Sequence, residues 1–468
     1  MVKKKKILLM SDDLRIPSGV GTMSKSLVTG TVQKYDWCQI GGAVNHPEAG
    51  KVFDLSEELN KSQNISDAYC KIYPVNGYGN EELLREIIAI EKPDGILHFT
   101  DPRFWGFLYN MEHELRQTTP IMYYNIWDDL PYPHWNENFY ESCDLLMAIS
   151  KQTYNINKHV SKRKPRVEGV DLTYVPHGID EKKFLPVDKQ AEELTKFKSD
   201  IVRGKDINFI ALFNSRNIHR KRPSDLMLGY KMFCDSLSKE EAAKVLLIMH
   251  TDPIDDAGTD LPTLSNALLG ECNVGFSTQK LDEKQLNYLY NIADVTCNPS
   301  SAEGFGLSHM ESLMSGTPTI VTVVGGLQDQ IGFKVDGEEI TVKHFTEDIP
   351  SNSTGKISKE HGEWAYPLWP QLNLQGSPQT PYIYDSRPSI ESICEGLKYW
   401  YNMTKEERET RGKAGREWAI TNGFTKKNMC DQAMLSIDKC FETFKPRGKY
   451  TLIDTSIESP IIKKGILI

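Results

Sequence analysis

The chain has 468 residues, which at ~150 residues per domain corresponds to two large or three smaller compact units and excludes a single small module. Apolar residues make up 39% and charged residues 25%, a balance that supports a substantial core and excludes a disordered chain. Lys and Arg number 55 against 64 Asp and Glu, and the resulting net charge of −9 opposes indiscriminate binding to nucleic acid or anionic lipid.

The sequence carries no signal for export or for a membrane. No apolar run approaches the ~18–20 residues that a spanning helix needs, and the four lysines at 3–6 lead into a short apolar run. The nine cysteines are scattered and never form a C-x-x-C pair, which favours buried thiols over disulfides or a zinc site. We therefore expect a soluble, cytoplasmic protein.

Short apolar runs alternate with helical patterns along the first part of the chain. Such alternation predicts a parallel sheet with helices on both of its faces. We predict strands at 6–10, 95–99, 121–125 and 145–149, and helices at 19–33, 81–90 and from 150 onward.

A charged stretch at 181–203 has little strand character, and the alternation begins again after it. The second series predicts strands at 208–213, 245–250, 294–298 and 319–323, and helices at 224–237, 283–292 and 306–315. We expect an α/β protein with two Rossmann-like domains facing each other across a cleft, and ligands at the carboxyl ends of the strands. The predicted division is a first domain over 1–185, a second over 186–430 with an insertion at about 331–387, and a terminal helix and tail over 431–468 that pack back on the first domain.

The most informative stretch runs from 299 to 311, between a predicted strand and a predicted helix. Its glycines, Gly304 and Gly306, let backbone approach a ligand closely, and the helix start directs free N–H groups at an anion such as a diphosphate. Glu303 precedes the helix and Glu311 lies about two turns further on, so both carboxylates can face one cleft and accept hydroxyl protons.

This stretch resembles the E-x7-E signature of retaining glycosyltransferases of the GT-B fold, family 4. The similarity extends to the segments 315–321, 325–326, 289–294 and 174–180. The resemblance implies transfer of a sugar from a nucleoside diphosphate sugar to an acceptor hydroxyl with retention, without a metal or a cofactor. It also implies that the second domain binds the donor and the first binds the acceptor.

The resemblance assigns roles to individual residues of the second domain. Glu303 would hold sugar hydroxyls and Glu311 the ribose, within a donor loop that includes Gly304 and Phe305. The diphosphate would be held without a metal by fixed positive charge and backbone amides. The groups expected to hold it are Arg216, Lys221 and the amides of Gly306 and Leu307. Arg220 and Arg222, beside them, also fit a solvated run of charge.

The first domain resembles the family more loosely. Gly19 and Gly21 match the family's glycine-rich loop beside the donor phosphates, although a tight turn between strand and helix would explain them as well. Family members commonly have a His after the strand at 121–125, where this chain has Trp127. Five other residues could contact the sugar or the acceptor in its place: Asp128, Asp129, His134, His98 and Asp101. Each of them could instead have a structural role, as a loop cap, a surface carboxylate or a packed His.

The sequence leaves the acceptor open. A glycan is the default, and a hydroxylated base in DNA is the alternative because the basic stretches 3–6 and 158–166 could contact phosphates. A non-catalytic scaffold that binds nucleotide sugars is the alternative from another class. Aromatic residues within the insertion, at 364, 366 and 369, could stack on a ligand, but packing against the core explains them better. The oligomeric state does not follow from the sequence.

Overall fold

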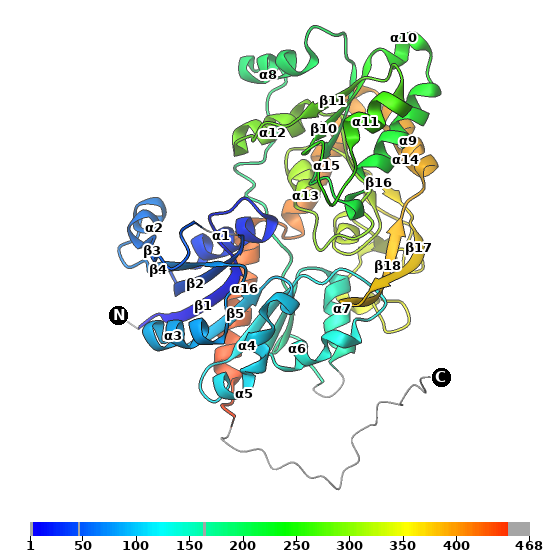
Figure 1. Cartoon of the computed structure of the whole chain (residues 1–468). Helices are drawn as coiled ribbons and strands as arrows, with labels where there is room; N and C mark the ends of the chain where they lie inside the picture. The colour runs from blue at the N-terminus through cyan, green and yellow to red at the C-terminus, as the bar shows by residue number, and fades with distance from the viewer. Residues whose placement is uncertain (1–2, 45–46, 162–164, 448–468) are drawn as a thin grey trace.

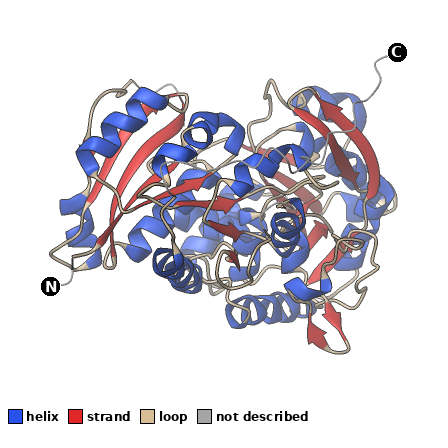
Figure 2. Ribbon diagram, turned by 90° about the horizontal axis from the view of Figure 1, so that it is seen from below, coloured by secondary structure: helices blue, strands red, loops and turns tan. Residues whose placement is uncertain are grey.

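The computed structural model describes residues 3–44, 47–161 and 165–447, which form two α/β units arranged one above the other (Figure 1). Helices lie along both faces of the strands in each unit (Figure 2). The predicted α/β class with two Rossmann-like units is confirmed, and its physical basis is the burial of apolar strands from both sides.

The first unit contains an eight-stranded sheet in the order β3-β4-β2-β1-β5-β6-β7-β8, parallel except where β3 pairs with β4. The strands are β1 (Lys5–Asp12), β2 (Tyr35–Val44), β3 (Phe53–Asp54), β4 (Cys70–Asn76), β5 (Gly95–Phe99), β6 (Ile121–Asn125), β7 (Leu145–Ala148) and β8 (Leu172–Tyr174). The helices are α1 (Gly19–Thr31), α2 (Ser56–Gln63), α3 (Glu81–Glu91), α4 (Gly106–Asn110), α5 (Glu112–Leu115), α6 (Glu137–Glu141) and α7 (Lys151–Val160).

The second unit contains a six-stranded parallel sheet in the order β11-β10-β9-β12-β13-β16. The strands are β9 (Phe209–Asn214), β10 (Val245–His250), β11 (Val274–Ser277), β12 (Val295–Asn298), β13 (Thr319–Thr322) and β16 (Ala365–Leu368). The helices up to the insertion are α8 (Glu192–Val202), α9 (Pro223–Asp235), α10 (Lys239–Ala242), α11 (Leu261–Leu264), α12 (Glu283–Ile292) and α13 (Leu307–Met314).

The insertion predicted at 331–387 adds a strand to the second sheet and a separate hairpin. After the short pair β14 (Lys334–Val335) and β15 (Glu338–Glu339) comes β16, and then β17 (Gln371–Ser377) pairs antiparallel with β18 (Thr380–Arg387). Two of its aromatic side chains pack on the helices that follow: the rings of Trp364 and Trp418 lie 4.9 Å apart, and those of Tyr366 and Tyr399 lie 5.2 Å apart. The structure therefore supports the packing interpretation for these two residues.

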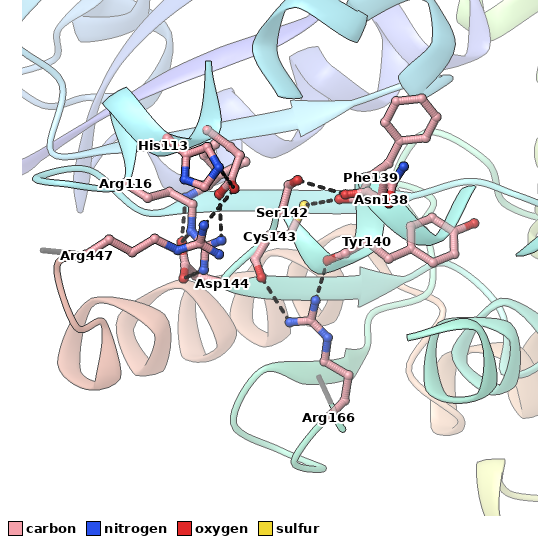
Figure 3. Close-up of polar contacts among 12 residues, drawn as sticks. His113, Arg116, Asn138, Phe139, Tyr140, Ser142, Cys143, Asp144, Arg166 and Arg447 are labelled. Atoms are coloured by element: carbon pink, nitrogen blue, oxygen red, sulfur yellow. Dashed lines mark hydrogen bonds and ion pairs between the residues drawn. The ribbon is translucent and has the colours of Figure 1, made fainter. Parts of the chain in front are cut away.

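The chain ends in three helices, α14 (Ile390–Tyr401), α15 (Lys405–Thr421) and α16 (Lys426–Thr443). The last of them returns to the first unit, where the Tyr35 hydroxyl donates to Asp438 (2.6 Å). Beyond the helix, Arg447 forms an ion pair of 2.6 Å with Glu112 (Figure 3). The two segments that join the units meet, because Ile179 N–H donates to Phe424 and Lys426 N–H donates back to Ile179. The boundaries at 185/186 and 430/431 stay predictions, and residues 448–468 of the predicted tail lie outside the described part.

Two general expectations concern the whole chain. All nine cysteines are free thiols, as the scattered spacing predicts. Within the described ranges, no helix combines the length and the apolar composition needed to cross a membrane.

Candidate active site

The clearest polar contact at the carboxyl ends of the second sheet joins Lys221 to Glu303. Lys221 lies in the short turn after β9, and Glu303 lies in the loop after β12. The Lys221 ammonium group donates to Glu303 Oε2. The side chains are 10% and 12% exposed, so the pair is largely shielded from water. Arg220 adds a second cation, donating to the Ala302 carbonyl (2.6 Å) and contacting Glu303 Oε2 at 3.4 Å.

Burial opposes the charge on both partners of this pair. It lowers the pKa of Lys221, although the Glu303 carboxylate works in the opposite direction. Burial alone would raise the pKa of Glu303, but the charges of Lys221 and Arg220 outweigh it and hold that pKa below its usual value. Glu303 is therefore an ionised carboxylate, able to accept hydrogen bonds from hydroxyl groups.

The helix α13 begins immediately after this loop. Gly306 adopts φ of 91°, which a glycine tolerates, and a Cβ there would lie 2.3 Å from Leu327 Cδ2. Because Gly306 has no side chain to cap the helix, the amides of Leu307 and Ser308 remain for an outside acceptor, whereas the His309 amide already donates to the Gly306 carbonyl. Phe305 is 3% exposed and packs its ring 5.2 Å from that of His177, which anchors the loop to the segment joining the two units.

Glu311 lies on the same helix and belongs to a separate hydrogen-bond chain. Asn214 at the end of β9 donates to the Tyr290 hydroxyl (2.7 Å), which donates to Glu311 Oε2 (2.7 Å). Burial raises the pKa of the Glu311 carboxyl to about 7, partly offset by the Tyr290 hydrogen bond. The two glutamates thus share one helix start but differ in their surroundings: Glu303 is paired with cations, and Glu311 is held by a phenol.

Arg216 lies apart from the Lys221–Glu303 pair. Its guanidinium forms an ion pair with Asp255 (Nε to Oδ2, 2.7 Å), and the side chain is 67% exposed. The structure thus brings Lys221, but not Arg216, onto Glu303. Sequence reasoning did not single out Arg220, which sits beside Glu303, because a run of basic residues after a strand reads equally well as solvated charge.

The loops of the two units approach each other closely across the cleft. A Cβ added at Gly304 would lie 3.1 Å from the Ile126 carbonyl oxygen, and one at Gly19 would lie 3.5 Å from Leu307 Cδ1. Gly325 follows β13, and a Cβ on it would meet Glu303 O at 2.1 Å and Asp128 Cβ at 3.4 Å. The contacts at Gly304 and Gly325 are too tight for a side chain, and the one at Gly19 is an ordinary van der Waals distance, so the donor loop and the first unit meet at one place.

The segment after β6 carries Trp127 and two acids into this junction. Trp127 is 8% exposed, and its indole N–H donates to the Asp129 carbonyl (2.8 Å), which fixes the turn. Burial raises the pKa of Asp128, with Glu303 adding to it and Arg220 and Lys221 opposing it. The pKa of Asp129 lies well above its ordinary value because of burial and the adjacent Asp128. Asp128 and Asp129 thus both face the junction, where burial disfavours their ionised forms.

The remaining first-unit candidates have mainly structural surroundings. His98 has no exposed surface, shares a 2.7 Å hydrogen bond with Tyr109 and stacks on Tyr123, and burial lowers its pKa to about 3. This is the environment of a packed core histidine. Asp101 caps the turn after β5 and pairs with Arg103. His134 is exposed, in the turn His134–Asn136.

Gly21 belongs to the turn between β1 and α1. A Cβ there would lie 2.6 Å from the Ile16 carbonyl oxygen and 2.8 Å from that of Asp13. The structure thus favours the tight-turn interpretation for Gly21, whereas Gly19 faces the second unit. The described residues contain no group of three or more His, Cys, Asp or Glu side chains placed to hold a metal ion.

The part of the chain that carries these residues matches a known protein family. The family model Glycosyl transferases group 1 matches residues 209–347, from β9 through the donor loop and α13 into the insertion. Residues 209–347 are a glycosyltransferase group 1 domain. The group 1 domain contains Lys221, Glu303 and Glu311, and the match confirms the predicted relationship to glycosyltransferases of the GT-B type.

Relatives of known name match parts of the chain. Mannosylfructose-phosphate synthase of Agrobacterium fabrum is 29% identical over 203 residues, 42% of this chain and 41% of that protein. D-inositol 3-phosphate glycosyltransferase of Corynebacterium urealyticum is 26% identical over 340 residues, 63% of this chain and 73% of that protein. The match to the first of these spans less than half of its length.

Solved structures resemble most of the chain. HepE of Anabaena, in complex with UDP and glucose, superposes with a TM-score of 0.63 at 12% identity, covering 93% of this chain and 99% of that one. Sucrose-phosphate synthase of Thermosynechococcus elongatus gives a TM-score of 0.63 at 17% identity, covering 94% and 100%. At such identities the likeness establishes the fold, and the fold of this chain, with its group 1 domain, is GT-B.

Proposed function

We propose that the chain transfers a sugar from a nucleoside diphosphate sugar to an acceptor hydroxyl, with retention at the anomeric carbon and without a metal. The observation that carries this proposal is the shielded Lys221–Glu303 pair beside the uncapped start of α13, at the junction with the first unit. A cation and free helix amides suit an anionic leaving group, and an ionised carboxylate suits sugar hydroxyls.

Each residue has a distinct task in the proposed reaction. Lys221 and the Leu307 amide stabilise the diphosphate as the glycosidic bond breaks, and Arg216 joins them by leaving Asp255. Glu303 accepts hydrogen bonds from the sugar, and Glu311 accepts them from the ribose. The acceptor hydroxyl attacks from the face of the leaving group, and a phosphate oxygen takes its proton. Since charge builds up on the diphosphate, these groups bind the transition state more strongly than the ground state.

A glycan or other sugar is the favoured acceptor class over a base in DNA. Three of the four lysines at 3–6, which could have contacted phosphates, are already paired: Lys4 with Asp67 (2.9 Å), Lys5 with Asp94 (3.0 Å) and Lys6 with Glu91 (2.8 Å). In the second basic stretch, Lys158 pairs with Glu168 (2.9 Å). Residues 162–164 of that stretch lie outside the described ranges.

The last cation of that stretch, Arg166, points inward. Its guanidinium donates to the main-chain carbonyls of Tyr140 and Cys143, and its side chain has no exposed surface (Figure 3). Such an arginine closes the end of α6 rather than presenting charge to a polyanion.

The test uses UDP-glucose as the first probe, because HepE was crystallised with UDP and glucose. Calorimetry measures UDP binding, and proton NMR follows slow hydrolysis of UDP-glucose without an acceptor. We expect α-glucose to appear before mutarotation, which is the signature of retention. Release of β-glucose would contradict the proposed stereochemistry. Binding without turnover of any nucleotide sugar, under all acceptors tried, would identify a scaffold instead.

A further inference from the structure

A cavity of about 250 Å³ opens beside the donor loop, between the two units and under the insertion. Asp128, Asp129 and Gln152 line it from the first unit, and Ser301 and Gly325 line it from the group 1 domain. The remaining wall comes from the insertion, from the segment 348–356 and from the β17–β18 hairpin. The volume lies just below the ~300–1,000 Å³ of drug-sized pockets, which corresponds to roughly one sugar ring.

The cavity adjoins the proposed reacting centre. Asp128, on its wall, is close enough to Glu303 and Lys221 for their charges to influence its pKa. Gly325, also on its wall, contacts the main chain of Glu303. A hydroxyl held in the cavity would therefore lie next to a sugar held by Glu303.

The polar groups of the cavity include hydroxyls that lack a partner. Ser353 and Ser386 are 7% and 9% exposed, and across the described ranges neither hydroxyl forms a side-chain hydrogen bond. In the same part of the chain, no other residue forms a hydrogen bond or ion pair with the carboxylates of Asp128 and Asp129. These hydroxyls and carboxyl groups line the cavity without side-chain partners of their own, so they can exchange hydrogen bonds with a ligand rich in hydroxyl groups.

The charge of the lining opposes an anion. Asp128, Asp129 and Asp348 carry acid groups, and Lys356 is the cation among the lining residues. Phosphate sites are usually built from arginine forks or helix starts, and the described lining contains no arginine. A phosphate in this cavity would stand beside these acids, whose ionised forms repel it at short range.

The wall formed by the insertion is held in place on both sides of the cleft. On the group 1 side, Arg387 forms an ion pair with Asp225 (2.6 Å). On the first-unit side, Tyr384 N–H donates to the Leu130 carbonyl (2.6 Å), and the ring of Tyr382 lies 4.5 Å from that of Trp135. Figure 1 shows the hairpin spanning from the upper unit towards α7.

We propose that this cavity is the acceptor pocket, and that it takes a neutral, hydroxyl-bearing ligand the size of one sugar ring and rejects a phosphorylated one. This inference rests on the proposed transferase function. It assigns to the insertion a task that the family resemblance does not: the insertion completes the acceptor wall and sets the charge selectivity.

The test measures the turnover of UDP-glucose with matched pairs of acceptors: glucose, mannose and myo-inositol, each with and without a phosphate group. We expect neutral acceptors to accelerate donor turnover with a kcat/KM at least ~10-fold above that of their phosphates, a factor that corresponds to ~1.4 kcal/mol. The charge-reversing variant Asp348→Lys should reduce this ratio by ~10-fold. Glu347→Lys is the matched control, because Glu347 is the neighbouring acid, is 63% exposed and is not part of the lining.

The outcomes separate this inference from the proposed function. Equal or better use of phosphorylated acceptors by the parent enzyme would overturn the inference, as would acceleration by hydroxymethylated DNA alone or by no neutral acceptor. An equal change of the ratio in both variants would also overturn it. In all of these cases UDP binding and acceptor-free hydrolysis would still support the transferase. Absence of UDP binding and of hydrolysis would instead contradict the function itself.

Discussion

Lys221 and Glu303 are 82 positions apart in the chain, yet the ammonium of one donates to the carboxylate of the other. The parallel sheet makes this possible, since β9 and β12 are neighbours and their carboxyl ends open on the same edge. The pair keeps both charges ready in a shielded place before any substrate arrives. Preorganised charge of this kind costs no rearrangement at the moment of reaction.

Removing Lys221 from this pair should affect both stability and UDP binding. Lys221→Met leaves Glu303 without its main counter-ion, and we expect a loss of unfolding free energy of about 3 kcal/mol. The double variant Lys221→Met with Glu303→Gln should recover most of the stability but no activity. Chemical denaturation and UDP calorimetry measure the two effects. Lys231→Met, which removes an exposed pair on α9, is the control; equal losses in both single variants would refute a special role for Lys221.

The two glutamates should divide their work. Glu311→Gln should weaken UDP binding about 10- to 100-fold, because a hydrogen bond to a charged group is worth ~1.5–3 kcal/mol. Glu303→Gln should leave UDP affinity nearly unchanged and reduce sugar transfer, since its partner is the sugar. Calorimetry of UDP and single-turnover kinetics are the measurements. Equal loss of UDP affinity in both variants would contradict this division.

The affinity for UDP should depend on pH through Glu311, whose burial raises its pKa to about 7. The ionised carboxylate accepts ribose hydrogen bonds better than the acid, so affinity should rise as pH increases through about 7. For stability the sign is opposite. The native state keeps its proton to higher pH than the unfolded chain, so this group's contribution is full below the unfolded pKa and is lost as pH rises towards 7.

The variant Glu311→Gln isolates this effect from the titration of UDP itself. The parent and the Glu311→Gln variant both bind UDP whose phosphate charge changes in the same way with pH, but only the parent has the Glu311 carboxyl group. The difference between their pH profiles should therefore carry a step near pH 7. Identical profiles from pH 5.5 to 8.5 would show that Glu311 does not sense the nucleotide.

Closure of the cleft should depend on the first unit. Gly19→Trp places a ring against Leu307, and Asp128→Asn removes a carboxylate from the junction. We expect UDP binding to persist and transfer to fall by at least ~100-fold, because misplacing the acceptor by about an ångström costs that much. Gly106→Trp is the control, since a Cβ there meets nothing within 4 Å. Full activity in the Gly19 and Asp128 variants would refute a two-unit site.

Activity should not require a divalent metal, because Lys221, Arg216 and the first amides of α13 supply the positive charge. We expect transfer rates to be equal, within error, with and without EDTA. A chelator that abolishes turnover, followed by recovery with Mg²⁺ or Mn²⁺, would contradict this prediction. Lys221→Met in excess Mg²⁺ is a useful companion, since a metal able to replace the lysine would restore its rate.

The sequence predicted most of the central strands because buried parallel strands read as continuous apolar runs. Predicted and observed bounds coincide for β5, β6 and β10 and for helix α12. Strands β2 and β4 were not predicted: Asp36, Gln39 and two glycines interrupt the first, and Pro74 the second. Helix α8 lies in the charged stretch 181–203, where its single buried apolar residue, Leu194, gives little periodicity.

The sequence by itself determined which residues stand at the carboxyl ends of strands, and so which carboxylates, glycines and cations could meet: Glu303, Glu311, Gly306 and Lys221 follow from local order. Only the tertiary structure decided the partners. It paired Arg216 with Asp255, brought Arg220 to Glu303 and enclosed His98 in the core. It also folded the insertion over Asp128 to make a cavity. Local spacing fixes a residue's place along one element, but distances between elements depend on how sheets pack and how chains cross between units, and no short pattern encodes these.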